Sequence, residues 1–360
     1  MEEQMQKLEK LGFDDWFRQR LDEDLIKDFQ PARVVSVDRG GCVIRTHAGH
    51  MSAELTGRML YGADESQQMP TVGDWVYAQV LDEGSFAVIH GIVGRRTLLR
   101  RRTAGRKTDF QLIAANIYTA MVMQALDADF NLRRLERYLV MINEGGINPL
   151  ILLNKADLLD PHQVEEKVSE IKSLMPDVDT VSMSCFSNDG IKKVSALLQP
   201  GKTYCLLGSS GVGKTTLLNA LSGSGEHRTS KVREKDGKGR HTTTRRQLIE
   251  LENGALIIDT PGMRELGSMS VEQGLKQTFD EIAQLAPGCR YNDCTHTVEK
   301  GCAVLAAVNE NRISRKRYEN YLKMHAESEY NDMTYIEKRR KDRQFGRMVK
   351  SVMKHRKKPV

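Results

Sequence analysis

The residues with the clearest chemical potential form a glycine-rich loop that ends in a lysine and a threonine. The loop matches the pattern G-x-x-x-x-G-K-[ST], follows an apolar run at 204–207 and precedes a helical segment at 216–221. In such a loop backbone N–H groups turn toward phosphates, Lys214 pairs with the β- and γ-phosphate oxygens and the Thr215 hydroxyl ligates Mg²⁺. The predicted phosphate-binding residues are Gly208, Ser209, Ser210, Gly211, Val212, Gly213, Lys214, Thr215 and Thr216.

A second motif, N-K-x-D, indicates which base the site would accept. Asn154, Lys155, Ala156 and Asp157 follow the apolar run 150–153. A carboxylate at Asp157 can accept two hydrogen bonds from the N1 and N2 edge of guanine, whereas adenine offers no such donor pair, and a buried carboxylate left unpaired is costly. The two motifs together therefore predict a guanine nucleotide. Ser184 and Cys185 could back the base, and an ordinary loop fits them equally well.

A third motif, D-x-x-G, follows the strand-like residues 256–258. Asp259 would hold Mg²⁺ through water, and the Gly262 N–H would sense the γ-phosphate. Residues 230–246 are rich in glycine, lysine and arginine, and we expect them to form a first switch in which Thr243 completes the Mg²⁺ shell. The alternative is an ordinary basic loop.

The residue after D-x-x-G bears on catalysis. It is Met263, where Ras-type GTPases carry a glutamine that orients the attacking water. Methionine cannot orient water, so we expect hydrolysis to be slow without a partner. His241 is a candidate for positioning the water, although a histidine in a basic loop is also typical of a phosphate contact or of a residue with no role.

Four potential metal ligands lie within fourteen residues near the C-terminus. They follow the pattern C-x4-C-x-H-x5-C and are Cys289, Cys294, His296 and Cys302. Three thiols and one imidazole suit tetrahedral Zn²⁺ and leave no position for a reactive water, so a structural site is expected. The alternative is a group of reduced, half-buried cysteines.

The elements that must position these residues follow from the apolar pattern. Runs at 118–124, 149–153, 203–207 and 255–258 read as strands separated by helical segments, which predicts an α/β domain with a mainly parallel sheet. The guanine motif at 154 precedes the phosphate loop at 208, the reverse of the usual GTPase order, so we expect a circularly permuted domain. A γ-phosphate contact at the D-x-x-G motif would then be transmitted mechanically to the residues that follow Leu266.

The pattern of apolar and polar residues is different in the N-terminal third. Residues 1–30 carry apolar positions at helical spacing and could form an appendage of one or two amphipathic helices. From 33 to about 100, short β-rich runs punctuated by glycine and aspartate predict a small antiparallel barrel of about five strands. Barrels of the OB type commonly bind nucleic acid, but packing or protein contact is also possible.

Charge is unevenly distributed along the chain. The net charge is +6, yet residues 336–360 hold eleven Lys/Arg against Glu337 and Asp342, which gives +9 and leaves −3 for residues 1–335. This basic tail is an electrostatic footprint for a polyanion such as RNA. A solvated terminal helix is the alternative.

Composition excludes several classes of protein. Ordinary hydrophobic content, no apolar run near 18 residues, an acidic N-terminus and six sparse cysteines argue against a fibrous, membrane-spanning, secreted or disulfide-scaffold protein. We expect a cytoplasmic chain without a membrane partner. The absence of a heptad pattern favours a monomer.

With its permuted NKAD, GSSGVGKTT, GRHTTT and DTPG motifs, a preceding barrel and a trailing cysteine-histidine cluster, the chain closely resembles the RsgA (YjeQ) family over about 31–330. The resemblance implies an OB-fold domain, a permuted GTPase domain and a zinc domain that grip the small (30S) ribosomal subunit and its rRNA, with GTP hydrolysis stimulated by the subunit late in its maturation and coupled to release. It implies GTP or GDP, Mg²⁺ and one structural Zn²⁺. Cys185 departs from the usual Ser-Ala.

The expected division is an N-terminal helical extension (1–30), an OB-fold barrel (31–105), a circularly permuted GTPase domain (106–267), a zinc-binding α-helical domain (268–335) and a basic tail (336–360). Two other functions remain open. One is an RNA chaperone or tether in which the nucleotide only stabilises the fold. The other is a signalling or metabolic GTPase without a ribosomal partner.

Overall fold

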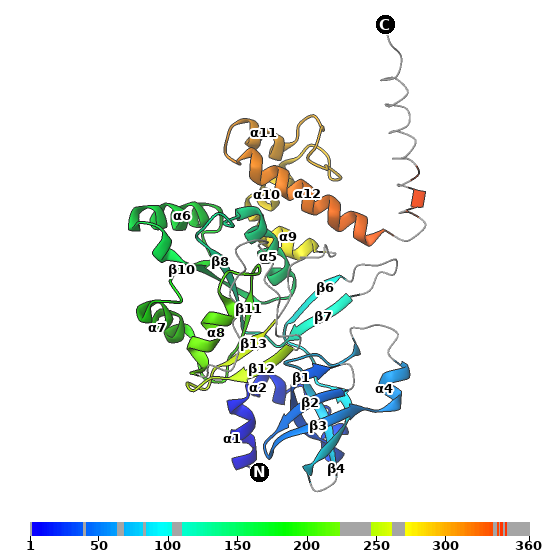
Figure 1. The fold of residues 1–360 in the computed structure, drawn as a ribbon. Helices are drawn as coiled ribbons and strands as arrows, with labels where there is room; N and C mark the ends of the chain where they lie inside the picture. Colours follow the sequence, from blue (N-terminus) through cyan, green and yellow to red (C-terminus); the bar gives the residue numbers. More distant parts are fainter. Residues whose placement is uncertain are drawn as a thin grey trace. The chain divides into compact units, whose positions relative to one another are not determined.

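The computed structural model describes residues 2–38, 41–62, 68–81, 84–102, 110–223, 246–260 and 271–333, with 337, 339, 340 and 343. It divides into two compact units at Gly267/Ser268 (Figure 1). His241, Thr243, Gly262, Met263 and nearly all of the basic tail lie outside the described residues. None of the described helices combines the length and apolar character that crossing a membrane requires.

A closed five-stranded barrel forms the lower part of the first unit in Figure 1. Its core takes alternate residues of the strands, such as Cys42 and Ile44. The predicted barrel is confirmed, but the expectation of purely antiparallel pairing is wrong for one pair, because β3 and β5 run parallel. The strands pair in the order β1-β2-β3-β5-β4 and back to β1, with β1 at Gln30–Asp38, β2 at Gly41–Thr46, β3 at Gly49–Leu55, β4 at Trp75–Leu81 and β5 at Phe86–Ile92; α4 is Gly57–Gly62.

The N-terminal segment is part of the core of the first unit. Its helices are α1 (Glu2–Lys10), α2 (Asp15–Arg18) and α3 (Leu25–Asp28). Phe13 and Phe17 are buried, and the Phe13 ring meets that of Trp75 on β4 edge to face with ring centroids 4.7 Å apart. The expectation of an appendage is therefore wrong: the apolar face of this segment is covered by the barrel.

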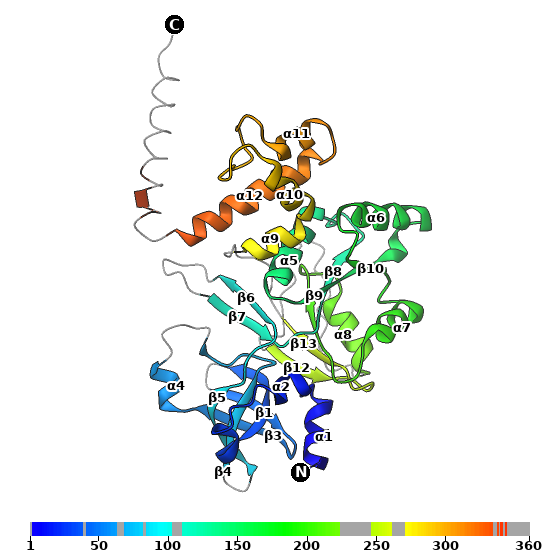
Figure 2. The same ribbon diagram turned by 180° about the vertical axis from the view of Figure 1, so that it is seen from behind.

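The part of the first unit that carries the predicted nucleotide motifs is a three-layer α/β domain. Its strands lie in the order β10-β9-β8-β11-β13-β12, and all but β12 are parallel, which confirms the predicted mainly parallel sheet. Successive side chains of each strand point to opposite faces of the sheet, and both faces are apolar. Helices α5 and α6 pack on one face, and α7 and α8 pack on the other (Figures 1 and 2). The bounds are β8 Thr119–Ala125, α5 Leu132–Glu144, β9 Asn148–Asn154, η3 Ala156–Leu158, α6 Pro161–Leu174, β10 Asp179–Ser182, α7 Asn188–Leu197, β11 Thr203–Leu207, α8 Lys214–Ser222, β12 Arg246–Glu250 and β13 Leu256–Asp259.

The barrel and this domain share one sheet. Strand β12 pairs with β13 on one side and with β1 of the barrel on the other, which joins eleven strands. A separate hairpin of β6 (Leu98–Arg102) and β7 (Phe110–Ala115) connects the two parts along the chain. Because β12 immediately follows the predicted first switch in sequence, the barrel is hydrogen-bonded directly to the strand that leaves that segment.

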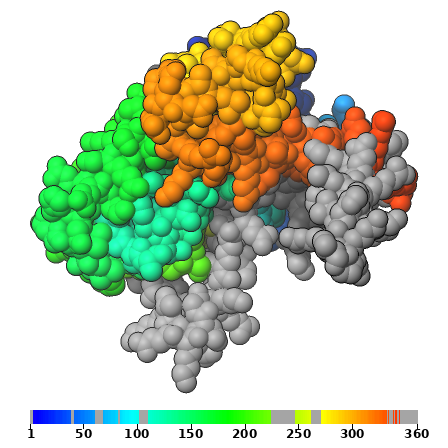
Figure 3. Space-filling view, turned by 90° about the horizontal axis from the view of Figure 1, so that it is seen from above, coloured from blue at the N-terminus to red at the C-terminus, as the bar shows by residue number. Residues whose placement is uncertain are grey.

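The described elements of the second unit are all helical. Figure 3 shows them as a continuous block of yellow to orange atoms. Arg317, almost fully buried, pairs with Glu281 and donates to the Thr278 carbonyl at 2.8 Å, which ties the longest helix to the two that begin the unit. The elements are α9 Glu272–Thr278, α10 Asp280–Leu285, η4 Ala286–Gly288, α11 Ala303–Asn309 and α12 Arg315–Asp332.

Candidate functional site

The glycine-rich loop joins the carboxyl end of β11 to the start of α8, as its sequence context predicts. Two of its glycines are required by close approaches. Gly208 has φ +141° and a Cβ there would lie 2.4 Å from the Met123 carbonyl oxygen; Gly213 has φ +105° and a Cβ would lie 2.3 Å from Asn154 Nδ2. Only glycine fits both positions, so the loop can lie closely against β8 and β9 where α8 begins.

Lys214 is folded back over this loop. Its Nζ donates to the carbonyl oxygens of Gly208 at 2.8 Å and Ser209 at 2.7 Å. Burial lowers the pKa of Lys214 to about 8, and the nearby charge of Asp259 opposes that shift. The ammonium group is therefore held by neutral acceptors in a place where phosphate oxygens would bind it more strongly.

Asn154 joins the guanine motif to the phosphate loop. It is buried at the end of β9, where its Nδ2 donates to the Val212 carbonyl at 2.7 Å and its Oδ1 accepts from the Cys185 backbone N–H at 3.0 Å. One side chain thus ties together three segments that lie far apart in the sequence. The structure therefore brings together the phosphate loop, the N-K-x-D motif and the 184–185 loop.

The other members of N-K-x-D lie at the same edge of the sheet. Lys155 has a left-handed backbone, with φ 63°, and its Nζ lies 2.7 Å from Asp127 Oδ2. Ala156 begins the short helix η3, and the Asp157 side chain beside it is exposed. The Asp157 carboxylate is thus accessible to a ligand next to the buried Asn154.

The 184–185 loop is held by local contacts. Ser184 is buried and its Oγ accepts from the Phe186 N–H at 3.2 Å. A Cβ on Gly190 would lie 2.5 Å from the Ser184 carbonyl oxygen, so this position in α7 needs glycine for steric reasons. The Cys185 thiol lies 3.8 Å from the Gly213 carbonyl oxygen, and burial raises its pKa to about 11. Cys185 is therefore uncharged at neutral pH.

Asp259 ends β13, the strand beside β11. It is 8% exposed and pairs in register with Leu206, one residue before the end of β11. The next residue, Thr260, is fully buried and its Oγ1 donates to the Leu206 carbonyl at 2.7 Å. This brings the Asp259 carboxylate to the phosphate-loop edge, and Thr215 in the first turn of α8 is half-buried there. Gly262, Thr243 and His241 lie outside the described residues.

Sequence reasoning missed two aspartates at this edge. Asp129 accepts from Ser209 Oγ at 2.7 Å and pairs with Arg134 of α5, while Asp127 binds Lys155. Burial opposes ionisation of Asp127, but hydrogen bonding and the charge of Lys155 lower its pKa overall. The signal that could have revealed them is their position immediately after β8, since carboxyl ends of neighbouring parallel strands share one edge.

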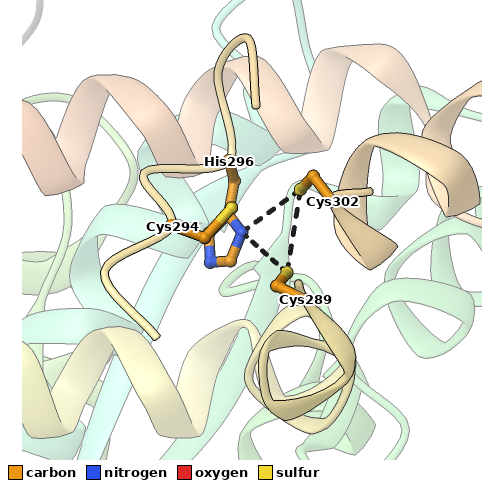
Figure 4. Close-up of side chains that lie close together, drawn as sticks. All are labelled: Cys289, Cys294, His296 and Cys302. Carbon is orange, nitrogen blue, oxygen red and sulfur yellow. Dashed lines mark hydrogen bonds between the residues drawn. The ribbon is translucent and has the colours of Figure 1, made fainter. Parts of the chain in front are cut away.

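The four predicted metal ligands converge in the second unit (Figure 4). His296 Nδ1 lies 3.5 Å from Cys289 Sγ and 3.4 Å from Cys302 Sγ, and the two sulfurs are 3.8 Å apart. The ligand atoms of all four residues, Cys294 included, lie within 4.8 Å of one another. Tetrahedral Zn²⁺ with Zn–S near 2.3 Å and Zn–N near 2.0–2.1 Å requires S···S of about 3.8 Å and S···N of about 3.5 Å. The donor set and its spacing fit zinc.

Surrounding contacts fix the orientation of the ligands. Tyr318 donates to the His296 carbonyl at 2.6 Å, and His296 itself has a left-handed backbone with φ 61°. Cys302 caps α11 by accepting from Leu305 N–H at 3.4 Å. Burial raises the pKa of Cys289, but hydrogen bonds from backbone N–H groups at the start of α11 and from the thiols of Cys302 and Cys294 together lower it overall. The N-terminus of α11 thus favours the thiolate form that a metal needs.

The sequence pattern of the RsgA GTPase family matches residues 92–269. The small ribosomal subunit biogenesis GTPase RsgA of Opitutus terrae is 40% identical over 333 residues, which cover 90% of each chain. RsgA 2 of Vibrio parahaemolyticus, with the same description, is 38% identical over 98% of this chain and 94% of its own. This chain belongs to the RsgA GTPase family.

Solved structures agree with this assignment. The crystal structure of YjeQ from Thermotoga maritima matches with a TM-score of 0.63 and 27% identity, over 83% of this chain and 98% of that one. YloQ, described as a circularly permuted GTPase, matches with a TM-score of 0.60 at 20% identity and supports the fold. As an RsgA GTPase, the chain is a circularly permuted GTP hydrolase, and its family implies a guanine nucleotide with Mg²⁺.

Proposed function

We propose that this GTPase acts in the biogenesis of the small ribosomal subunit, binding the 30S particle and leaving it after the particle has stimulated GTP hydrolysis. Two observations together carry the proposal. The phosphate loop and the guanine motif lie at one edge of the sheet and are joined by Asn154. A relative that matches over 90% of each chain is named a small ribosomal subunit biogenesis GTPase. A ribosomal partner also implies a cytoplasmic location.

Each residue of the nucleotide site has a proposed role that follows from its motif. Residues 208–216 hold the phosphates through backbone N–H groups, Lys214 binds β- and γ-phosphate oxygens, and Thr215 ligates Mg²⁺. Asp259 lies at the same edge and orients a water of the Mg²⁺ shell. Asp157 is exposed beside Asn154 and reads guanine, with Ser184 and Cys185 backing the base.

Dependence on a partner follows from the sequence of the second switch. Met263 replaces the water-orienting glutamine, so the bare enzyme lacks one catalytic element. The roles assigned to Thr243, His241 and Gly262, in the Mg²⁺ shell, in positioning water and in sensing the γ-phosphate, stay proposals. The 30S particle would complete the site, in the manner of an activating partner.

The second unit supports contact with ribosomal RNA. One structural Zn²⁺, held by Cys289, Cys294, His296 and Cys302, would stabilise the segment between α10 and α11. On that segment the Arg290 guanidinium lies over the Tyr291 ring, 5.6 Å from its centroid, and Val298 is 86% exposed. Exposed aromatic rings and guanidinium planes can stack on unpaired bases. The basic tail would add phosphate contacts.

We also propose that the chain is monomeric and that its barrel, GTPase domain, zinc domain and tail have the boundaries given above, with residues 1–30 packed on the barrel as part of the first unit. The test is co-sedimentation of the full chain with purified 30S or 50S particles in the presence of GDP or a non-hydrolysable GTP analogue. We expect 30S binding that is stronger with the analogue, and weaker for Tyr291→Ala than for the matched control Tyr330→Ala on α12. Equal binding to both particles, or none, would contradict the proposal.

A further inference from the structure

A recess of about 220 Å³ lies in the first unit where the N-terminal helices, the barrel and the nucleotide domain meet. Its walls include Asp14 at the start of α2, Arg33 on β1 and Arg96 just before β6. The walls also include Tyr118 and Lys202, the residues immediately before β8 and β11. The recess thus opens at the amino ends of the parallel strands, whereas the nucleotide motifs lie at their carboxyl ends.

Arg33 is a buried cation, and among the residues that the structure describes it has only neutral acceptors within hydrogen-bond distance. It is 1% exposed. Its guanidinium donates to the carbonyl oxygen of Leu11, to that of Gly73 at 3.1 Å and to Thr203 Oγ1 at 2.9 Å. Burial lowers its pKa to about 10, with Asp74 and Asp14 acting in the opposite direction at longer range. The positive charge is therefore desolvated, and the described part of the chain provides no direct counter-ion for it.

The two carboxylates that act on Arg33 are bound to other arginines. Asp74 accepts two hydrogen bonds from Arg95, at 2.7 and 2.8 Å, and Asp14 pairs with Arg96 at 2.5 Å. Within the described ranges, the carboxylates thus attract Arg33 only at longer range.

Lys202 adds a further positive charge. Its Nζ lies 5.0 Å from the centroid of the Tyr118 ring, and the described part of the chain gives it no carboxylate within ion-pair distance. Three cationic side chains of the lining, Arg33, Arg96 and Lys202, therefore face one carboxylate, Asp14, so the described lining of the recess carries a net positive charge.

We propose that this recess binds a small phosphate-bearing anion, such as inorganic phosphate or a short phosphate monoester. Its volume is below the range of about 300–1,000 Å³ typical of drug-sized ligands, which suits a phosphate group with little attached. The recessed position among Arg33, Arg96 and Lys202 favours a free ion over a phosphate of an RNA duplex. This site is additional to the proposed function and does not depend on it.

The site is separate from the phosphate loop although it is connected to it. Strand β11 runs from Thr203, which contacts Arg33, to Leu207, which precedes Gly208, and its two ends are about 13 Å apart. An anion in the recess would brace the N-terminal helices and the barrel against the strand that carries the phosphate loop. Its expected effect is higher thermal stability of the first unit.

The test is calorimetric titration of inorganic phosphate into the full chain at constant ionic strength, with Lys214→Ala to disable the phosphate loop. We expect saturable binding with a Kd of about 1 mM or tighter, retained in Lys214→Ala. Lys202→Ala should weaken it about tenfold or more, because a charge-assisted contact is lost. The matched control is Lys193→Ala, which removes an exposed lysine of α7 outside the recess.

A second variant is expected to raise the affinity for phosphate, which separates anion binding from a purely structural role of these residues. Asp14→Asn removes the carboxylate that binds Arg96 and should tighten phosphate binding about two- to fivefold. The Asp14 side chain makes no capping hydrogen bond to α2, so the helix start is retained. No saturable binding, equal effects of Lys202→Ala and Lys193→Ala, or loss of binding in Lys214→Ala would each overturn the proposal.

Discussion

Replacing Asn154 by alanine tests how the nucleotide site is held together. Asn154 is 2% exposed, and its amide makes both bonds that join the N-K-x-D motif to the other loops. Alanine leaves the Val212 carbonyl and the Cys185 N–H without these partners. An unsatisfied buried polar group costs about 1–3 kcal/mol. Because Cys185 is only half-buried and water can reach it, we expect a total loss near 2–4 kcal/mol.

This loss should appear in two measurements. The free energy of unfolding, from urea titration of the nucleotide-free protein, should fall by about 2–4 kcal/mol. GDP affinity, from calorimetry, should fall about tenfold or more, since both loops must be ordered again on binding. The matched control is Asn148→Ala, the same residue type at the other end of β9, which is exposed and donates to the Tyr118 carbonyl at 3.0 Å.

Asn148→Ala should change the free energy of unfolding by no more than about 0.5 kcal/mol and leave GDP affinity unchanged. The reasoning is refuted if Asn154→Ala unfolds at the same urea concentration as the parent and binds GDP equally well. In that case the two hydrogen bonds of Asn154 would contribute neither to the free energy of unfolding nor to GDP affinity.

Three further predictions concern the same sites. Burial lowers the pKa of Lys214 from 10.5 to about 8, so the ammonium group loses its proton as the pH rises through 8. Because bound phosphate favours the protonated form, GDP affinity should fall between pH 7 and pH 9 in the parent protein. Titration of Lys214→Arg with GDP should show no such fall, because arginine keeps its charge. Gly213→Ala should abolish GDP binding while circular dichroism stays unchanged, because its Cβ would lie 2.3 Å from Asn154 Nδ2 at φ +105°, and retained affinity would contradict the steric argument. Cys302→Ser should lose the bound zinc, measured by atomic absorption, and expose residues 268–333 to protease, whereas Cys42→Ser in the barrel should keep the metal.

Local spacing was enough to predict the parts of the site that are continuous in sequence. The strand, loop and helix around Lys214 follow from periodicity and glycine positions, and the ligand set from Cys289 to Cys302 follows from spacing. The bridge through Asn154 depends on β9 lying near β11, with β8 between them, and strand order is not encoded in any short segment. Asp127 and Asp129 were missed for the same reason.

The elements that sequence reasoning misjudged depend on long-range packing. Burial of the N-terminal segment requires the Trp75 face of the barrel, and the parallel pairing of β3 with β5 requires a crossover between them. Arg33 is charged, a type that is almost never fully buried unless it is paired, so composition alone would place it at the surface. Only the junction of three chain segments supplies enough carbonyl oxygens to bury it.

The most direct test of the central claim is GTP hydrolysis by the full chain alone, with 30S particles and with 50S particles, using Lys214→Ala as a blank. A circularly permuted GTPase with methionine after its D-x-x-G motif should turn over slowly alone and be strongly stimulated by 30S particles only. Equal rates in all three conditions would contradict the account.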